Sequence, residues 1–136
     1  MISVLVLTFN EELNLQRCLE SIAWSDDVLV LDSYSTDDTL AIAEQSGARV
    51  MQRRFDDFAG QRNHGLKHGA LRHEWVLHLD ADEIVTPELR DELLGVSESP
   101  DAKDAYRLAS RLMFRGRWLR HAGMFPTYQV RFGRKS

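Results

Sequence analysis

Short apolar runs alternate with segments of helical periodicity over the first 95 residues of the chain. Continuous apolar runs rich in β-branched residues are typical of strands buried on both faces of a sheet. Such runs predict buried strands at residues 2–9 and 28–31, and two further strands are expected at residues 49–53 and 75–79. Strands that alternate with helices in sequence form a parallel sheet covered by those helices. The pattern therefore predicts an α/β fold with a mostly parallel sheet wound with helices.

The first two expected helices have polar residues suited to their starts. Asn10 precedes a segment with apolar residues at helical spacing, namely Leu13, Leu15, Leu19 and Ile22. Ser35 precedes a second helical segment at residues 36–45. Both side chains can accept a hydrogen bond from a free amide of the first helical turn, so we expect both to act as N-caps.

The next two expected helices follow the third and fourth strands. One lies within residues 55–68, where Phe58 and Leu66 are expected to face inward. The other begins after Thr86, with a proline at its first position, and is expected to end at Gly95. Residues 97–103 are polar and read as a surface loop, and the aromatic and arginine-rich residues beyond them predict a strand-rich extension.

Polar residues follow three of the predicted strands directly. In open parallel sheets, ligands bind beyond the carboxyl ends of the strands. This rule selects residues 8–11 after the first strand, 32–35 after the second and 80–83 after the fourth. We expect a functional site where these three segments meet.

The segment after the fourth strand holds three acidic residues in four positions, Asp80, Asp82 and Glu83. Like charges placed side by side cost free energy unless a cation or hydrogen-bond donors compensate them. Mg²⁺ and Mn²⁺ take carboxylate oxygens as ligands, usually together with phosphates of the substrate. The cluster therefore indicates a metal–diphosphate site, and the alternative is an acidic loop that caps the next helix.

Three other residues could take part in such a site. Asp32 ends a buried strand and could accept hydrogen bonds from a nucleobase or ribose, or it could be a turn residue satisfied by nearby amides. Phe9 could stack on a base, or it could be a core residue beside an ordinary helix cap. Arg62 could pair with phosphate or orient a carboxylate, or it could be an exposed helical arginine. The histidines lack the spacing of a zinc site.

Four segments, taken together and in this order, resemble glycosyltransferase family 2, whose domains have the GT-A type nucleotide-sugar fold. They are Thr8-Phe9-Asn10-Glu11, residues 30–39, Arg62-Asn63 with Gly65, and Asp80-Ala81-Asp82-Glu83. Residues 56–63 and 117–123 are similar to the lipopolysaccharide core glucosyltransferases within that family.

The resemblance implies a UDP-sugar donor and a divalent cation. The residues that it places around the nucleotide sugar are Thr8, Phe9, Asn10, Glu11, Asp32, Arg62, Asp80 and Ala81. Asp32 would hold the uracil or ribose, Arg62 would fix the diphosphate or Asp80, and Asp82 would ligate Mg²⁺ or Mn²⁺. The cation would stabilise the departing UDP as a Lewis acid.

The resemblance also implies an inverting transfer of a sugar, glucose in the similar subgroup, to a lipopolysaccharide-core or other glycan acceptor. Residues 1–95 would form the donor-binding region, and residues 96–136 the truncated start of an acceptor-side region. The catalytic base is unassigned and is expected beyond Ser136. A haloacid-dehalogenase-type phosphatase is the alternative, because Asp80 and Asp82 also match its strand-end motif.

Charge is divided unevenly along the chain, whose formal net charge is −4. Residues 1–102 have a net charge of −12, and residues 103–136 have a net charge of +8. The basic segment, with Phe114, Trp118 and Phe125, is expected to contact an anionic membrane at its inner face, or else to pair with the acidic part. A lipid- or nucleic-acid-binding module is a third interpretation, but it leaves the acidic cluster unexplained, so no nucleic acid partner is expected.

Composition sets the remaining limits. With 43% hydrophobic and 28% charged residues, the chain has the make-up of a globular protein. Its apolar runs are far shorter than the roughly 20 residues of a membrane span. The single cysteine, Cys18, cannot form an internal disulfide, which is typical of a reducing cytoplasm. We therefore expect a cytoplasmic protein.

Overall fold

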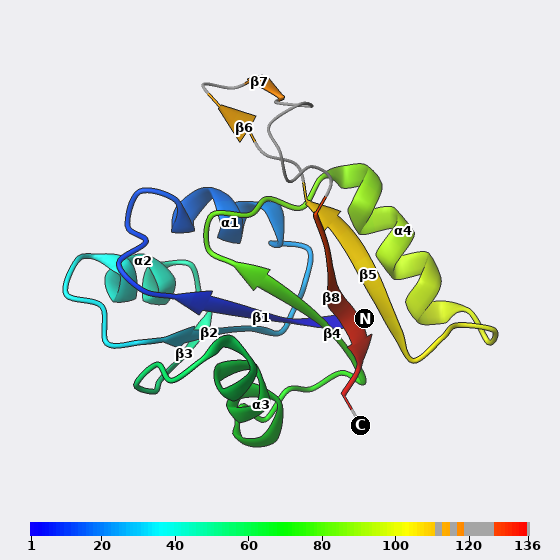
Figure 1. Ribbon diagram of the computed structural model, residues 1–136, viewed down its shortest axis with the longest axis horizontal. Coiled ribbons are helices and arrows are strands. Elements are labelled where there is room, and N and C mark those ends of the chain that lie inside the picture. Colours follow the sequence, from blue (N-terminus) through cyan, green and yellow to red (C-terminus); the bar gives the residue numbers. More distant parts are fainter. Residues whose placement is uncertain (111–112, 115–116, 119–126, 136) are drawn as a thin grey trace.

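The computed structural model describes residues 1–110, 113–114, 117–118 and 127–135. Within these ranges, six strands form one sheet in the order β3-β2-β1-β4-β8-β5. The parallel strands are β1 (Ile2–Thr8), β2 (Val28–Asp32), β3 (Arg49–Gln52) and β4 (Trp75–Asp80). The expected α/β fold with a mostly parallel sheet is therefore confirmed (Figure 1).

The chain adds strands after the parallel part, as the strand-rich extension predicted. β8 (Thr127–Arg134) runs antiparallel between β4 and β5 (Ala105–Ser110). A separate two-stranded ladder is formed by β6 (Met113–Phe114) and β7 (Arg117–Trp118), which lie between β5 and β8 in sequence. The last strand in sequence therefore lies beside β4, which carries the acidic cluster at its end (Figure 1).

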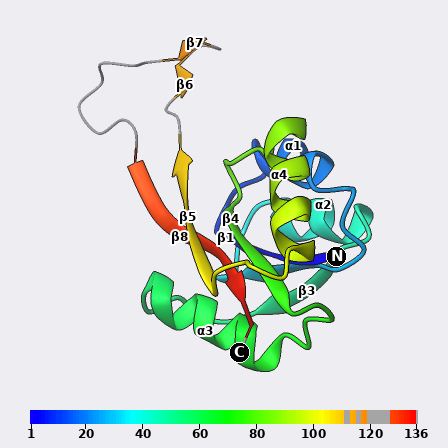
Figure 2. The same cartoon turned by 90° about the vertical axis from the view of Figure 1, so that its right-hand side faces the viewer.

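Helices cover both faces of the sheet (Figure 2). α1 (Leu15–Ser21), α2 (Thr39–Gln45) and α4 (Pro87–Glu98) lie on one face, and α3 (Phe58–His68) lies on the other. Alternate residues of β1 supply the two cores: Val4 and Val6 pack with α1, α2 and α4, whereas Leu5 and Leu7 face α3. This alternation explains why β1 reads as one uninterrupted apolar run, since both of its faces are buried.

α3 lies close to the sheet because of a glycine at its contact with β1. A Cβ atom at Gly65 would lie 2.7 Å from Cδ2 of Leu5, which is buried. Any side chain at position 65 would force the Leu5 side chain to shift, so the glycine allows the helix to approach at this point. The close approach fixes the position of Arg62, one turn earlier on the same helix.

Four local expectations were wrong, for identifiable reasons. α4 continues through Gly95 to Glu98, because a helical glycine in open space lowers stability without breaking the helix. Phe58 is 58% exposed, because it lies in the first turn of α3 beside Phe55 and outside the core. Asn14 occupies the cap position of α1 in place of Asn10, and α2 begins only at Thr39, since Ser35 bonds to Asp32 instead.

Candidate functional site

The loops after β1 and β2 are bound to each other at the carboxyl edge of the sheet. The Asn10 amide donates to Oγ of Ser35 at 2.8 Å, and Oδ1 of Asn10 accepts from the Thr36 amide at 2.8 Å. The Glu11 amide donates to Oγ1 of Thr39 at 2.9 Å. Asn10 has a positive φ of 51°, a conformation that asparagine tolerates better than most residues. The two predicted segments therefore form one structural unit.

Asp32 lies beneath this unit and is fully buried. Its Oδ1 accepts from the hydroxyls of Thr8 and Ser35, each at 2.6 Å. Its Oδ2 accepts from the Ser35 amide at 2.8 Å and from Nε2 of Gln52 at 3.4 Å. An ionised carboxylate has about four acceptor positions, and all are used here. In the structure the Asp32 carboxylate is therefore occupied by one backbone amide and three side-chain donors, and a contact with a nucleoside stays a prediction.

Aromatic side chains are exposed above the buried carboxylate. Phe9 is 57% exposed, so it is not the core residue that the alternative interpretation described. Tyr34, in the loop after β2, is 54% exposed and has a positive φ of 61°. A bulky residue rarely adopts this conformation, and such outliers cluster at functional sites. The edge of the sheet therefore presents two exposed rings beside the Asn10–Ser35 contact.

The acidic segment after β4 is held by two arginines. Nη1 of Arg131, from β8, lies 2.6 Å from Oε1 of Glu83, and its Nη2 lies 3.1 Å from Oδ2 of Asp80. On the other side, Nη2 of Arg62 lies 3.5 Å from Oδ1 of Asp80. The Asp80 amide also donates to Oε1 of Glu83 at 2.7 Å, which closes the turn. The structure thus brings Arg62 to Asp80, one of the two contacts expected of it.

The two residues between Asp80 and Glu83 point in opposite directions. Asp82 is exposed, and its carboxylate makes no hydrogen bond or ion pair within the part of the chain that the structure describes. Ala81 is only 2% exposed, and it belongs to the core cluster beneath α1. The Ala81 methyl group is thus buried while the Asp82 side chain is exposed, and a contact between Ala81 and the nucleotide sugar stays a prediction.

Two titratable groups beside the acidic segment have strongly displaced pKa values. Burial, with the positive charges of Arg62 and Arg131, lowers the pKa of His78 to about 4. Burial raises the pKa of the Cys18 thiol to about 12, and Glu83, Asp82 and Asp80 add to this shift. His78 is therefore neutral and Cys18 is protonated at neutral pH. The site contrasts a positive side, where Arg62 and Arg131 lie, with a negative side around Asp82.

The described residues fit a divalent cation only in part. No group of three or more His, Cys, Asp or Glu side chains in the described ranges could hold a metal ion by itself. Magnesium sites in nucleotide enzymes, however, usually use one or two carboxylates, with phosphates and waters as the other ligands. Asp82 supplies one exposed carboxylate, and Oδ1 of Asp80 is buried without a hydrogen-bond partner in the described ranges. These oxygens are suited to a cation that arrives with a diphosphate.

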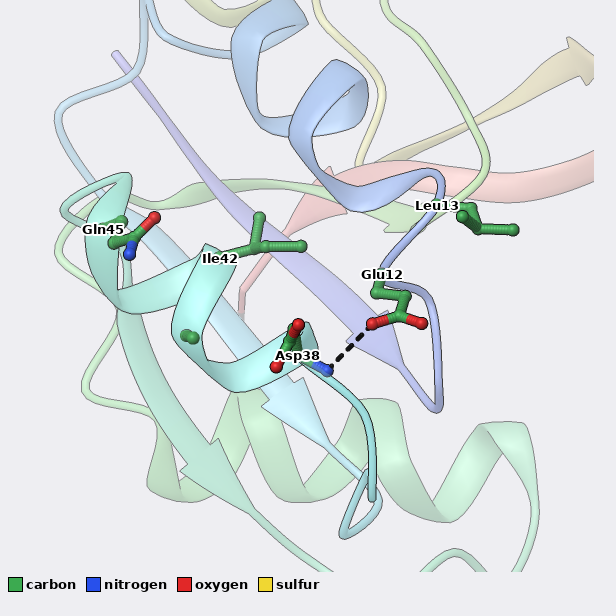
Figure 3. Close-up of a pocket in the computed structure, with 6 residues that line it drawn as sticks. Glu12, Leu13, Asp38, Ile42 and Gln45 are labelled. Carbon is green, nitrogen blue, oxygen red and sulfur yellow. Dashed lines mark hydrogen bonds between the residues drawn. The ribbon is translucent and has the colours of Figure 1, made fainter.

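A surface pocket lies to one side of this site, between α2 and the loop before α1 (Figure 3). It is lined by Glu12, Leu13, Asp38, Ala41, Ile42 and Gln45. The Asp38 amide donates to Oε2 of Glu12 at 3.2 Å across its rim. None of the predicted site residues lines this pocket, so it is separate from the acidic segment after β4.

Comparison with known proteins agrees with this geometry. The model of the family described as glycosyl transferase family 2 matches residues 3–132, which is nearly the whole chain. The chain belongs to glycosyl transferase family 2. This membership, together with the position of the Asp80–Glu83 segment after the fourth strand, favours a glycosyltransferase over the phosphatase alternative.

Curated proteins named as glycosyltransferases match most of the chain. An uncharacterized glycosyltransferase of Rickettsia typhi is 36% identical over 118 residues, 85% of this chain and 40% of the relative. The lipopolysaccharide core biosynthesis glycosyltransferase LpsC of Rhizobium meliloti is 30% identical over 115 residues, 81% of this chain and 42% of the relative. The chain thus spans about two fifths of the length of the relatives that it matches.

Solved structures confirm the GT-A type fold expected of a family 2 domain. Glucosyl-3-phosphoglycerate synthase of Mycobacterium tuberculosis, in complex with Mn²⁺, UDP and phosphoglyceric acid, has a TM-score of 0.64 and 28% identity. The likeness covers 77% of this chain and 41% of the synthase. S. aureus TarS has a TM-score of 0.62 over 98% of this chain and 47% of TarS, and at 23% identity it supports the fold alone.

Sequence analysis missed several residues of this family 2 site. Arg131 was grouped with the basic segment at residues 103–136. In the structure it is only 5% exposed and contacts Asp80, which lies 51 residues earlier in the sequence. Gln61 is 1% exposed and donates through Nε2 to Ser33 and to the Arg53 carbonyl. The sequence did hold one signal for Arg131. It directly precedes Phe132 in β8, and because alternate strand residues face opposite sides, a buried Phe132 places Arg131 on the other face of the sheet.

The basic segment is partly accounted for. Arg134 pairs with Glu74 and Asp104, and Nζ of Lys135 donates to the Leu71 carbonyl. For Arg134 these contacts agree with the alternative in which the basic segment pairs with acidic residues. Phe125 lies outside the described residues. None of the described helices has the length and hydropathy needed to cross a membrane.

Proposed function

We propose that this chain carries the donor site of a glycosyltransferase that uses a UDP-sugar and a divalent cation. The observation that carries the proposal is the arrangement at the carboxyl edge of the sheet. There the linked loops after β1 and β2 lie at the same edge as an acidic segment with one exposed carboxylate, in a family 2 domain. The related synthase from M. tuberculosis was solved with Mn²⁺ and UDP-glucose, which supports this donor class.

The nucleoside would lie against the linked loops. Phe9 is exposed at the carboxyl edge of the sheet, where its ring could stack on the uracil. Thr8 and Asn10 set the shape of the loop that carries Phe9. Glu11 is fixed through its amide to Thr39 and lies behind this loop. Asp32 would act from below, because its buried carboxylate holds the Thr8 and Ser35 hydroxyls in place. Its contribution to binding is therefore preorganisation of the two loops.

The diphosphate would lie between the loops and the acidic segment. Asp82 would ligate Mg²⁺ or Mn²⁺, since its carboxylate is exposed and makes no other contact in the described ranges. Arg62 would orient Asp80 and face the phosphates, because its guanidinium already lies beside that carboxylate. The bound cation would supply Lewis-acid stabilisation of the leaving UDP.

The transfer would invert the anomeric carbon. The acceptor hydroxyl would attack that carbon as its bond to the UDP oxygen breaks, and a base would take the hydroxyl proton. We propose a carboxylate outside the described residues as the base. The likeness to LpsC supports a lipopolysaccharide-core or other glycan acceptor, and the likeness to the synthase supports glucose as the sugar. In this proposal residues 1–95 bind the donor and residues 96–136 begin the acceptor side, although that boundary falls inside α4.

Calorimetric titration of UDP with and without Mn²⁺ tests the proposal. We expect Mn²⁺ to raise UDP affinity by about tenfold or more, equivalent to about 1.4 kcal/mol. Asp82→Asn should remove most of that gain, since a hard cation loses a charged ligand. Asp91→Asn is the matched control, because Asp91 is an exposed acid on α4 that pairs with Arg90. Equal UDP affinity with and without Mn²⁺ in the wild-type protein would refute the metal-dependent donor site.

A further inference from the structure

Arg131 is a buried cation at a position that no strand-end motif identifies. It is 5% exposed, and it reaches three groups at the end of β4. Nη1 donates to Glu83 at 2.6 Å and to the His78 carbonyl at 3.3 Å, and Nη2 donates to Asp80 at 3.1 Å. Burying a charge is costly unless it is paired and hydrogen-bonded, so these contacts are required for Arg131 to lie there.

The strand register places Arg131 against the acidic segment. β8 is antiparallel to β4, and Phe132 lies opposite Leu77. Phe132 is 1% exposed in the core beneath α1 and α4, so its neighbour Arg131 must face the other side of the sheet. That side also carries His78 and Asp80, because they alternate with Leu77 and Leu79 along β4. The contact is therefore built into the sheet.

Among the side chains that the structure describes around Asp80, the formal charges nearly balance. Arg62 and Arg131 flank Asp80 from two different elements, and Arg131 also pairs with Glu83. With the exposed Asp82, these five side chains carry two positive and three negative formal charges. One unit of negative charge at an exposed carboxylate is a weak site for a free dication. A nucleotide sugar diphosphate is a dianion, so its complex with a dication is neutral and leaves this balance unchanged.

We propose that Arg131 is a positioning residue that makes cation binding depend on the nucleotide. By pairing with Asp80 and Glu83, it stops these carboxylates from joining Asp82 in a site for free metal, and it holds the turn in the shape that receives a metal–diphosphate. This inference rests on the proposed function, which supplies the cation and the diphosphate. It adds a role for a strand that lies about 50 residues beyond the acidic segment.

The affinity for Mn²⁺ alone separates the two explanations, because the inference predicts an increase whereas damage to the fold would lower it. Free Mn²⁺ is measured by electron paramagnetic resonance in titrations of the wild-type chain and Arg131→Gln, without and then with UDP. Arg131→Gln removes one positive charge from beside Asp80 and Glu83, so it should bind Mn²⁺ alone about three- to tenfold more tightly than wild type. The factor by which UDP strengthens Mn²⁺ binding should fall correspondingly.

Two further variants isolate the charge effect. Arg131→Lys keeps the positive charge, so its affinity for Mn²⁺ alone should stay within about twofold of wild type. Arg134→Gln removes the same charge three residues further along β8, where Arg134 pairs with Glu74 and lies opposite Trp75, and it should leave Mn²⁺ affinity unchanged. Circular dichroism and thermal melting establish that each variant is folded.

The outcomes separate this inference from the proposed function. If folded Arg131→Gln binds Mn²⁺ alone no more tightly than wild type, the inference is wrong, whatever UDP does. If Arg131→Gln does not fold, Arg62→Gln takes its place, since it removes the same charge from the other side of Asp80 and should also tighten Mn²⁺ binding. If wild type binds no UDP under any condition, the proposed function fails, while the comparison with Mn²⁺ alone still decides the role of Arg131.

Discussion

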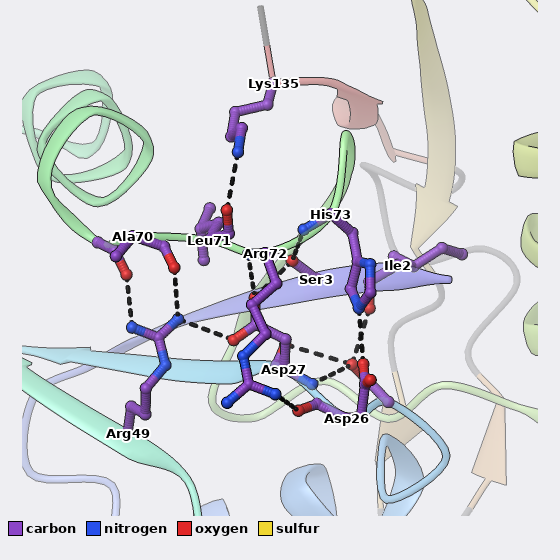
Figure 4. Close-up of polar contacts among 12 residues, drawn as sticks. Ile2, Ser3, Asp26, Asp27, Arg49, Ala70, Leu71, Arg72, His73 and Lys135 are labelled. Carbon is purple, nitrogen blue, oxygen red and sulfur yellow. Dashed lines mark hydrogen bonds and ion pairs between the residues drawn. The ribbon is translucent and has the colours of Figure 1, made fainter.

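Replacing Asp27 by asparagine tests how the amino ends of the strands are held together. Asp27 immediately precedes β2, is 2% exposed and lies among polar contacts at the amino ends of the strands (Figure 4), whereas the acidic segment follows the carboxyl end of β4. Its Oδ2 accepts from the Ser3 hydroxyl at 2.6 Å and from the Arg72 amide at 2.7 Å. Its Oδ1 accepts from Nη2 of Arg49 at 2.8 Å. One carboxylate thus joins β1, β2, β3 and the segment before β4.

The size of the effect follows from these contacts. An asparagine amide keeps one oxygen and replaces the other by an NH₂ group. If the NH₂ group takes the place of Oδ1, it faces the Arg49 guanidinium; if it takes the place of Oδ2, it faces the Arg72 amide. Either way, two donors meet in a buried site and a charge-assisted bond is lost. We expect a loss of about 2–4 kcal/mol of unfolding free energy, since hydrogen bonds to charged groups contribute about 1.5–3 kcal/mol each.

Urea denaturation at several pH values measures this loss. Burial alone would raise the pKa of Asp27, but donors from Arg72, Ser3 and Arg49 outweigh it and the pKa is lowered. A lowered pKa in the folded state gives stability that is present above the unfolded pKa of about 4 and is lost as pH falls through the folded value. The difference between wild type and Asp27→Asn should therefore be full at neutral pH and shrink below about pH 4.

A neighbouring carboxylate provides the control for this experiment. Asp26 is exposed and pairs with His73 at the surface, so Asp26→Asn should leave the urea midpoint nearly unchanged. UDP affinity should stay unchanged in both variants, because both positions lie far from the site. Equal stability of Asp27→Asn and wild type at neutral pH would refute the argument that these three donors require a charged acceptor.

Three other outcomes are expected. Asp32→Ala should lower UDP affinity about tenfold in calorimetry, both with and without Mn²⁺, because the loops after β1 and β2 lose the carboxylate that holds them. Asp38→Asn, on the exposed side of the loop after β2, should leave UDP affinity unchanged. A loss of affinity seen only in the presence of Mn²⁺ would contradict the assignment. Iodoacetamide at pH 8 should alkylate Cys18 about a hundredfold or more slowly in the folded chain than in urea, since its pKa is raised to about 12 in the fold; equal rates would contradict the burial of Cys18. In flotation assays the chain should bind anionic vesicles at low salt and be released at high salt, because each Lys or Arg near such a surface contributes about 1 kcal/mol; no binding at low salt would exclude a membrane contact of the basic segment.

The sequence by itself determined the parallel part of the fold and the edge where the site lies. Apolar runs placed β1 and β2, the strand pattern placed β3 and β4, and polar residues identified the strand ends at Thr8, Asp32 and Asp80. These features depend on local periodicity and on the rule that the carboxyl ends of parallel strands share an edge. Family membership was also visible in four segments, because each is a short stretch of neighbouring residues in the sequence.

Only the tertiary structure decided how the charged and polar groups of the site are paired. Asp32 looked available for a nucleoside, yet hydroxyls from Thr8 and Ser35 and the amide of Gln52 occupy its carboxylate. Arg131 looked like part of a solvated basic segment, yet the register of β8 against β4 buries it beside Asp80. Neither pairing follows from local pattern, because it depends on which distant strand lies alongside and on which of its two faces each residue takes.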